Sequence, residues 1–137
     1  MYGSAHREWR NRWIHYVMIP VECVCFQIFL SMTLGTEANV VVGVFLAVLS
    51  VLMATKMTIG VLCAVFHLAA TLATEWFTDT LPWWPLFVGA WIAWGLAWAV
   101  QVCVGHYICE QNQPNVANMS TVSNLSITLS VLIAWST

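Results

Sequence analysis

One stretch of sequence decides the class of fold: Val40–Thr74, which reads VVVGVFLAVLSVLMATKMTIGVLCAVFHLAATLAT and contains one charged residue, Lys56. A transmembrane helix needs roughly 20 apolar residues, so this stretch is too long for one span. Lys56 divides it into parts of about 16 to 18 residues, each just able to cross a core of roughly 30 Å with slight thinning. We therefore expect two helices that turn at Ala54–Lys56. The alternative, one long helix, would place a lysine near the bilayer centre at a cost of about 2.5–3.5 kcal/mol.

The composition of the whole chain also indicates an integral membrane protein. Of its 137 residues, 61% are hydrophobic and only 7% are charged, whereas a soluble domain carries roughly 25% charged residues. The formal net charge of −2 gives no reason to expect nucleic acid or another strongly charged partner. The five cysteines form no CxxC pair, so we expect small core residues rather than a disulfide framework.

The other apolar runs complete an all-α membrane fold. We expect a bundle of four transmembrane helices and a C-terminal fifth span or interfacial helix, within one domain covering residues 1–137. Residues 35–39 are predicted to form a turn. Glu75–Pro85, which is rich in the tryptophan typical of a membrane interface, is predicted to form a loop. The expected spans are residues 13–34, 39–55, 57–74, 86–105 and 119–135.

The fourth predicted span carries a ladder of residues spaced four apart. The ladder consists of Gly89, Ala93, Ala97, Gln101 and Gly105. Small residues at this spacing let a neighbouring helix approach closely. The tryptophans of the same span lie on a different face, where we expect them to meet lipid or neighbouring helices.

The basic residues orient this topology in the membrane. With four spans, the N-terminus, the turn at Lys56 and the segment after Val104 share one side, and all four Lys and Arg residues lie there: Arg7, Arg10, Arg12 and Lys56. Cytoplasmic loops carry an excess of Lys and Arg. We therefore predict that this side faces the cytoplasm, or the matrix if the membrane is mitochondrial.

Three histidines are expected at that same membrane face. His6 and His15 precede or open the first span, and His106 closes the fourth. Asn11, His15 and Glu22 share one stripe of the first helix. Glu22 would lie about 10 Å below His15, inside the apolar layer, where a carboxyl group must be paired, protonated or functional.

The end of the fourth span, Gln101–Pro114, reads QVCVGHYICEQNQP and contributes further polar residues. On an α-helix, His106 and Glu110 would share one face, a spacing that suits two metal ligands or an acid–base pair. Each residue also has an ordinary interpretation, since interfacial histidines anchor helix ends and Gln101 can hold two helices together. We expect His67, near the middle of the third span, to be a packed histidine bonded to a backbone carbonyl. The convergence of His6, His15 and His106 at one membrane face is what indicates a metal or redox site.

Two spaced motifs carry a resemblance to a known family. They are His6-x4-Asn11-x3-His15-x4-Pro20 and Trp98-x2-Gln101-x3-Gly105-His106-x3-Glu110-x3-Pro114. This pattern resembles the 2-hydroxy fatty acid dioxygenase family, which consists of small multi-span membrane proteins such as the fungal 2-hydroxypalmitate dioxygenases. The resemblance covers both ends of the chain and, more loosely, the spans between them.

The resemblance implies an iron(II)-dependent oxidoreductase of the endoplasmic reticulum that acts in fatty acid α-oxidation. Such an enzyme shortens long-chain 2-hydroxy fatty acids by one carbon with molecular oxygen. The resemblance implies His6, His15 and His106 as iron ligands. Gln101 and Glu110 are then catalytic candidates that orient imidazoles or take up a proton.

The remaining candidates support this centre or the substrate. Asn11 would orient an imidazole, and Glu22 lies on the same stripe. Our own inference, outside the family motifs, is that the carboxylate of the substrate is held by Arg7, Arg10 or Arg12. The chain departs from the family where Arg7 replaces a second histidine found in many members and Tyr107 replaces a glycine.

A different class of function stays open beside the enzyme. The chain could be a catalytically silent accessory subunit of a larger membrane complex, for example a respiratory complex of the mitochondrial inner membrane, with other membrane subunits as partners. The tryptophan faces and the small-residue ladder would then contact subunits or lipid. A proton relay through Glu22 and His67 is a third hypothesis, but the sequence lacks the repeated or broken helices typical of transporters.

Overall fold

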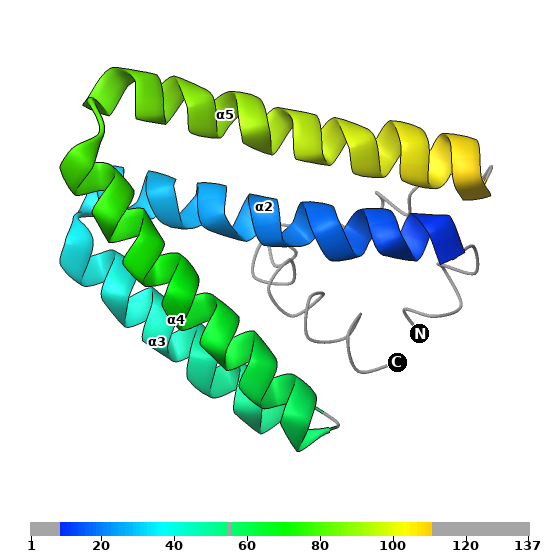
Figure 1. Ribbon diagram of the computed structural model, residues 1–137, viewed down its shortest axis with the longest axis horizontal. Coiled ribbons are helices and arrows are strands. Elements are labelled where there is room, and N and C mark those ends of the chain that lie inside the picture. Colours follow the sequence, from blue (N-terminus) through cyan, green and yellow to red (C-terminus); the bar gives the residue numbers. More distant parts are fainter. Residues whose placement is uncertain (1–8, 55, 111–137) are drawn as a thin grey trace.

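The computed structural model describes residues 9–54 and 56–110, and all of their regular structure is helical (Figure 1). The elements are α2 (Trp9–Leu34), α3 (Thr36–Met53), α4 (Met57–Thr80), α5 (Trp83–Ala99) and the π-helix η1 (Val100–Glu110), which continues α5. The predicted fifth span or interfacial helix, residues 119–135, lies outside the described residues.

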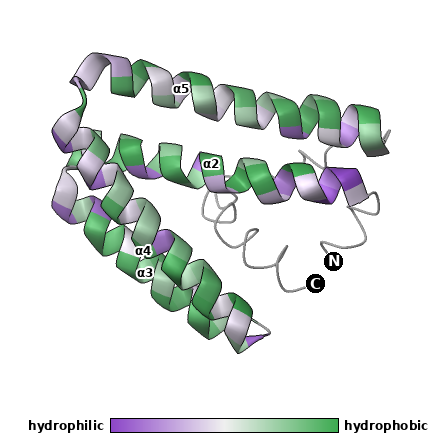
Figure 2. Ribbon diagram, in the orientation of Figure 1, coloured by the Kyte–Doolittle hydropathy of each residue, from purple (hydrophilic) through white to green (hydrophobic). Residues whose placement is uncertain are grey.

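Four helical segments are long and apolar enough to cross a membrane: Trp9–Leu34, Thr36–Met53, Met57–Thr80 and Trp83–Cys109. Their outward surfaces expose large apolar side chains such as Leu52 and Leu72. Figure 2 shows hydrophobic residues along all of these helices, with hydrophilic ones at the start of α2 and at the α3–α4 turn. An apolar surface this extensive fits lipid rather than water, as the composition predicted for an integral membrane protein.

The helix α2 lies between α5–η1 on one side and the α3–α4 hairpin on the other (Figure 1). One face of α2 presents Asn11, His15 and Glu22 to α5 and η1. The other face packs Ile19 and Cys23 against Cys63 of α4. The polar stripe predicted from the sequence is therefore one of two buried faces of the same helix.

The helices α3 and α4 form the antiparallel hairpin that the sequence predicted, and the single-helix alternative is wrong. Glycines allow the two backbones to come close. A Cβ at Gly43 would overlap the hydroxyl of Thr71, and a Cβ at Gly60 would lie 2.8 Å from the carbonyl oxygen of Ser50. Close backbone contact between helices is the role expected of small residues in membranes.

The predicted turn at residues 35–39 is shorter than expected. Only Gly35 separates α2 from α3, and its φ of 91° is a conformation that glycine adopts without steric cost. Residues 36–39 belong to α3. The side chain of Asn39 donates a 2.6 Å hydrogen bond to Glu75, which joins the first turn of α3 to α4.

The predicted loop Glu75–Pro85 is also wrong over most of its length. Its first six residues, Glu75–Thr80, are the last turns of α4, because this segment contains neither Gly nor Pro. Leu81 is extended, as favoured for a residue that precedes a proline. The helix α5 then begins at Trp83, three residues before the predicted start of the fourth span at residue 86.

The helices α2 and α5 run antiparallel, since His15 contacts Gln101 and the ring of Phe29 packs on those of Phe87 and Trp91. The start of α2 and the end of η1 therefore lie at the same end of the molecule, as does the turn before Met57 (right in Figure 1). The polar residues at the start of α2 and those of η1 are thus brought to one place.

Candidate functional site

A chain of hydrogen bonds links α2 to η1 at this end of the molecule. The Nδ1–H of His15 donates to Oε1 of Gln101 at 2.5 Å, and Nε2 of Gln101 donates to Oε1 of Glu22 at 2.6 Å. All three side chains are buried, with 7%, 7% and 5% of the surface of His15, Gln101 and Glu22 exposed. The side-chain amide of Gln101 thus joins His15 and Glu22, which lie two turns apart on α2.

This arrangement selects one form of the His15 ring. The oxygen of the Gln101 amide can only accept a hydrogen bond, so Nδ1 of His15 carries a hydrogen, and in the neutral ring Nε2 then carries the lone pair. A histidine whose Nδ1–H is held by an acceptor is oriented to use Nε2 as a metal ligand or a base. The donation from Gln101 to Glu22 keeps the amide oxygen turned toward His15.

His106 lies beside His15 at the end of this chain. The two imidazole rings are 5.4 Å apart between centroids and are inclined by 61°. His15 is buried in α2, whereas His106 on η1 is partly exposed. Two imidazoles from different helices therefore meet at one site, as the predicted topology required.

The π-helical winding of η1 makes this meeting possible. In an α-helix, Gln101 and His106 would be rotated by about 140° from one another, because five residues exceed one turn of 3.6. A π-helix is bonded from residue i to residue i+5, so residues five apart lie on nearly the same face. Gln101 and His106 consequently both face α2, and π-helical segments often occur at functional sites.

Gly105 lets η1 approach α2 at this point. A Cβ at Gly105 would overlap Oδ1 of Asn11, lie 3.2 Å from its Cγ, and lie 3.9 Å from Nε2 of His15. Asn11 is fully buried in this contact. The backbone of η1 therefore packs on Asn11 and lies beside the His15 ring.

The structure thus brings together five of the predicted site residues: Asn11, His15, Glu22, Gln101 and His106. The arginines are placed differently. Arg10 and Arg12 are exposed on α2, and the guanidinium of Arg10 lies 5.7 Å from the ring centre of Trp9. His6 and Arg7 lie outside the described residues, as does the side chain of Glu110, the last residue of η1.

A second group of buried polar residues lies on the hairpin side of α2, and sequence reasoning largely missed it. Gln27 of α2 and His67 and Thr74 of α4 are fully buried. Neither ring nitrogen of His67 has a hydrogen-bond partner among the described residues, so the predicted bond to a backbone carbonyl is wrong there. The spacing of Gln27 four residues after Cys23 was the available signal, because it continues the buried stripe.

The described part of the chain holds two neighbouring imidazoles but no complete set of metal ligands. Within residues 9–54 and 56–110, no three His, Cys, Asp or Glu side chains converge as a metal ion would require. His15 and His106 provide two neighbouring imidazoles, a donor type that suits non-haem iron. The third histidine of the two motifs is His6.

All five cysteines are free thiols. Three of them, Cys23, Cys25 and Cys63, are buried as predicted for core residues, whereas Cys103 is exposed.

Comparison with known proteins identifies the family. No curated protein and no solved structure matches the chain. A family model described as 2-hydroxy-palmitic acid dioxygenase Mpo1-like matches residues 1–135. This confirms the resemblance drawn from the two histidine motifs and extends it over nearly the whole sequence. The chain therefore belongs to the Mpo1-like family of 2-hydroxy-palmitic acid dioxygenases.

Proposed function

We propose that this protein is a dioxygenase that shortens long-chain 2-hydroxy fatty acids by one carbon with molecular oxygen. The observation that carries the proposal is the hydrogen-bonded chain from Glu22 through Gln101 to His15, with His106 beside it. His15, Gln101 and His106 belong to the two motifs that carry the resemblance to the family, and the family model matches residues 1–135. A buried hydrogen-bond chain that fixes an imidazole tautomer is typical of a catalytic or metal centre.

We assign His6, His15 and His106 as the residues that would hold an iron(II) ion. Bound iron would supply the redox chemistry through which dioxygen reacts with the substrate. Gln101 holds the Nδ1–H of His15 and so directs its Nε2 toward the centre, while Glu22 fixes the Gln101 amide. The side chain of Asn11 packs on Gly105 and so helps to hold η1 beside the His15 ring.

The location of the site suits a fatty acid. His15 lies two turns into α2, near the end where Arg10 and Arg12 are exposed. A substrate carboxylate held by these arginines, or by Arg7, would stay at the headgroups while its tail enters the hydrocarbon layer. Glu110 remains our candidate for taking up a proton. We assign this face to the cytoplasm on the positive-inside rule, and the membrane to the endoplasmic reticulum.

Oxygen uptake by the purified protein tests the proposal. Full-length protein in detergent, loaded anaerobically with iron(II), should consume oxygen when given 2-hydroxypalmitate and should release a product one carbon shorter, detected by mass spectrometry. His106→Gln should abolish uptake and lower bound iron. His67→Gln, which alters the buried histidine on the other side of α2, is the matched control and should retain both.

A folded, iron-loaded wild-type protein that consumes no oxygen with this substrate would contradict the proposal. Loss of activity in the His67 variant alone would also contradict it, since it would move the centre to the hairpin side. The accessory-subunit alternative is favoured by no observation on the described residues. Co-purification of the chain with a fixed set of membrane subunits would favour the accessory subunit over the enzyme.

A further inference from the structure

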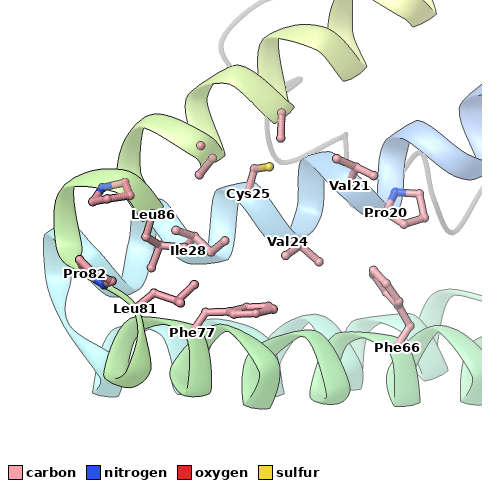
Figure 3. Close-up of a pocket in the computed structure, with 14 residues that line it drawn as sticks. Pro20, Val21, Val24, Cys25, Ile28, Phe66, Phe77, Leu81, Pro82 and Leu86 are labelled. Atoms are coloured by element: carbon pink, nitrogen blue, oxygen red, sulfur yellow. The ribbon is translucent and has the colours of Figure 1, made fainter.

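An apolar groove of about 570 Å³ lies between α2, α4 and α5 (Figure 3). Its wall on α2 runs from Pro20 to Ile28, and Figure 3 shows Phe66 of α4 pointing toward that helix and Phe77 of α4 lying in the space between the two helices. The only heteroatom among the lining side chains is the sulfur of Cys25. The groove therefore offers hydrocarbon contacts and no means of recognising a polar group.

Small residues on α5 create this space. Gly89, Ala90 and Ala93 line the groove, and a Cβ at Gly89 would meet nothing within 4 Å. The predicted close approach of a helix along the whole small-residue ladder is therefore wrong at Gly89. The ladder packs tightly further along, where Ala97 is buried and Gly105 touches Asn11.

Along the axis of α2, the groove begins level with Glu22 and continues away from His15. Of its lining residues on α2, Val21 directly precedes Glu22 in sequence and Pro20 precedes Val21. Pro20 is about 7.5 Å along the helix from His15, and Ile28 is about 20 Å from it. One leaflet of a bilayer spans half of a core of roughly 30 Å, or about 15 Å. The distance from His15 to the far end of the groove thus suits one acyl chain of membrane length.

We propose that this groove binds the acyl tail of the 2-hydroxy fatty acid while the head of the molecule lies at His15 and His106. This inference rests on the proposed function for the identity of the head group. The volume falls within the roughly 300–1,000 Å³ typical of small-molecule sites.

The groove then determines which chain lengths the enzyme accepts. Lipid tails are as apolar as the groove, so transfer from membrane to groove contributes little and shape decides the preference. A side chain added at Gly89 would project into open space midway along the α5 wall. It would obstruct a long tail and leave a short one, which ends before that point, unaffected.

The experiment compares Gly89→Leu with Gly95→Leu across a series of 2-hydroxy fatty acids from short to long chains. Gly95 is on the same helix, a Cβ there also meets nothing within 4 Å, and it does not line the groove. Gly89→Leu should lower kcat/KM for long chains by roughly 5- to 150-fold, the range expected for forcing a methylene chain past a filled site. Its kcat/KM for short chains, and the whole profile of Gly95→Leu, should match wild type.

A direct binding measurement separates this inference from the proposed function. Wild-type protein is photolabelled with a 2-hydroxy fatty acid that carries a diazirine near the end of its tail, and the labelled peptides are identified by mass spectrometry. Labels on Phe66, Phe77 or the Leu86–Ala93 segment, competed by unlabelled 2-hydroxypalmitate but not by phospholipid, support the groove even if no turnover is found.

Three results would overturn the groove assignment while leaving the dioxygenase standing. The first is normal turnover with an unchanged chain-length profile in a folded Gly89→Leu variant. The second is labelling confined to residues outside the groove. The third is equal competition by phospholipid, which would make the groove a general lipid contact. Absence of turnover with every chain length would instead contradict the proposed function.

Discussion

At Gly105 the backbone of η1 lies against Asn11 of α2, so a single added methyl group tests the geometry of the whole site. A Cβ there would overlap Oδ1 of Asn11 and lie 3.2 Å from its Cγ. Asn11 is fully buried, so its side chain cannot withdraw into solvent. We expect Gly105→Ala to push η1 away from α2 and to disturb His15 and His106 together.

The magnitude follows from two opposing terms. Overpacking a filled site costs about 1–3 kcal/mol, and the upper part of that range applies because the Asn11 side chain is enclosed. Replacing Gly by Ala in a helix returns up to about 1 kcal/mol. The net loss should therefore be about 2 kcal/mol. Gly95→Ala, where the added Cβ meets nothing within 4 Å, should be neutral or stabilising by up to about 1 kcal/mol.

The assay is unfolding of both variants in mixed micelles titrated with sodium dodecyl sulfate and followed by circular dichroism, with iron content measured on the same samples. The two alanine variants should differ by about 3 kcal/mol, and only Gly105→Ala should lose iron. Equal stability of the two variants, with iron and oxygen uptake retained in both, would refute the packing of η1 on Asn11.

Three further predictions concern other contacts. Gln101→Leu removes the amide that bonds His15 and Glu22. It should lower the free energy of unfolding by about 2–4 kcal/mol and reduce iron affinity by roughly 10- to 100-fold, as measured by unfolding and metal titration. An unchanged affinity would show that the amide does not orient an imidazole. Gly43→Ala should destabilise the hairpin by about 1–3 kcal/mol, and adding Thr71→Ala should restore part of this loss in a double-mutant cycle, whereas strict additivity would show that the two residues do not touch. Asn39→Leu removes the hydrogen-bond donor to the Glu75 carboxyl and should lower the free energy of unfolding by about 1–3 kcal/mol. An unfolding midpoint equal to wild type would show that this hydrogen bond does not stabilise the protein.

The sequence was sufficient for the features that depend on transfer into lipid. Each of the four helical segments is apolar enough to cross a membrane because of its own residues, and Lys56 marks a turn because a charge is costly in the core of a bilayer. The antiparallel order of the spans then placed His15 and His106 at the same end before any contact was known. Motif spacing alone also identified the family, since the residues of the two motifs are readable without a fold.

Only the tertiary structure decided how those residues meet. The sequence allowed His106 and Glu110 to share an α-helical face, whereas the π-helical winding of η1 pairs His106 with Gln101. The winding of a helix depends on what it packs against, here the Asn11 face of α2. The groove beside Gly89 depends likewise on where α4 leaves α2. Hydropathy and charge are properties of each residue in turn, but register and empty space arise between helices and are fixed only when they pack.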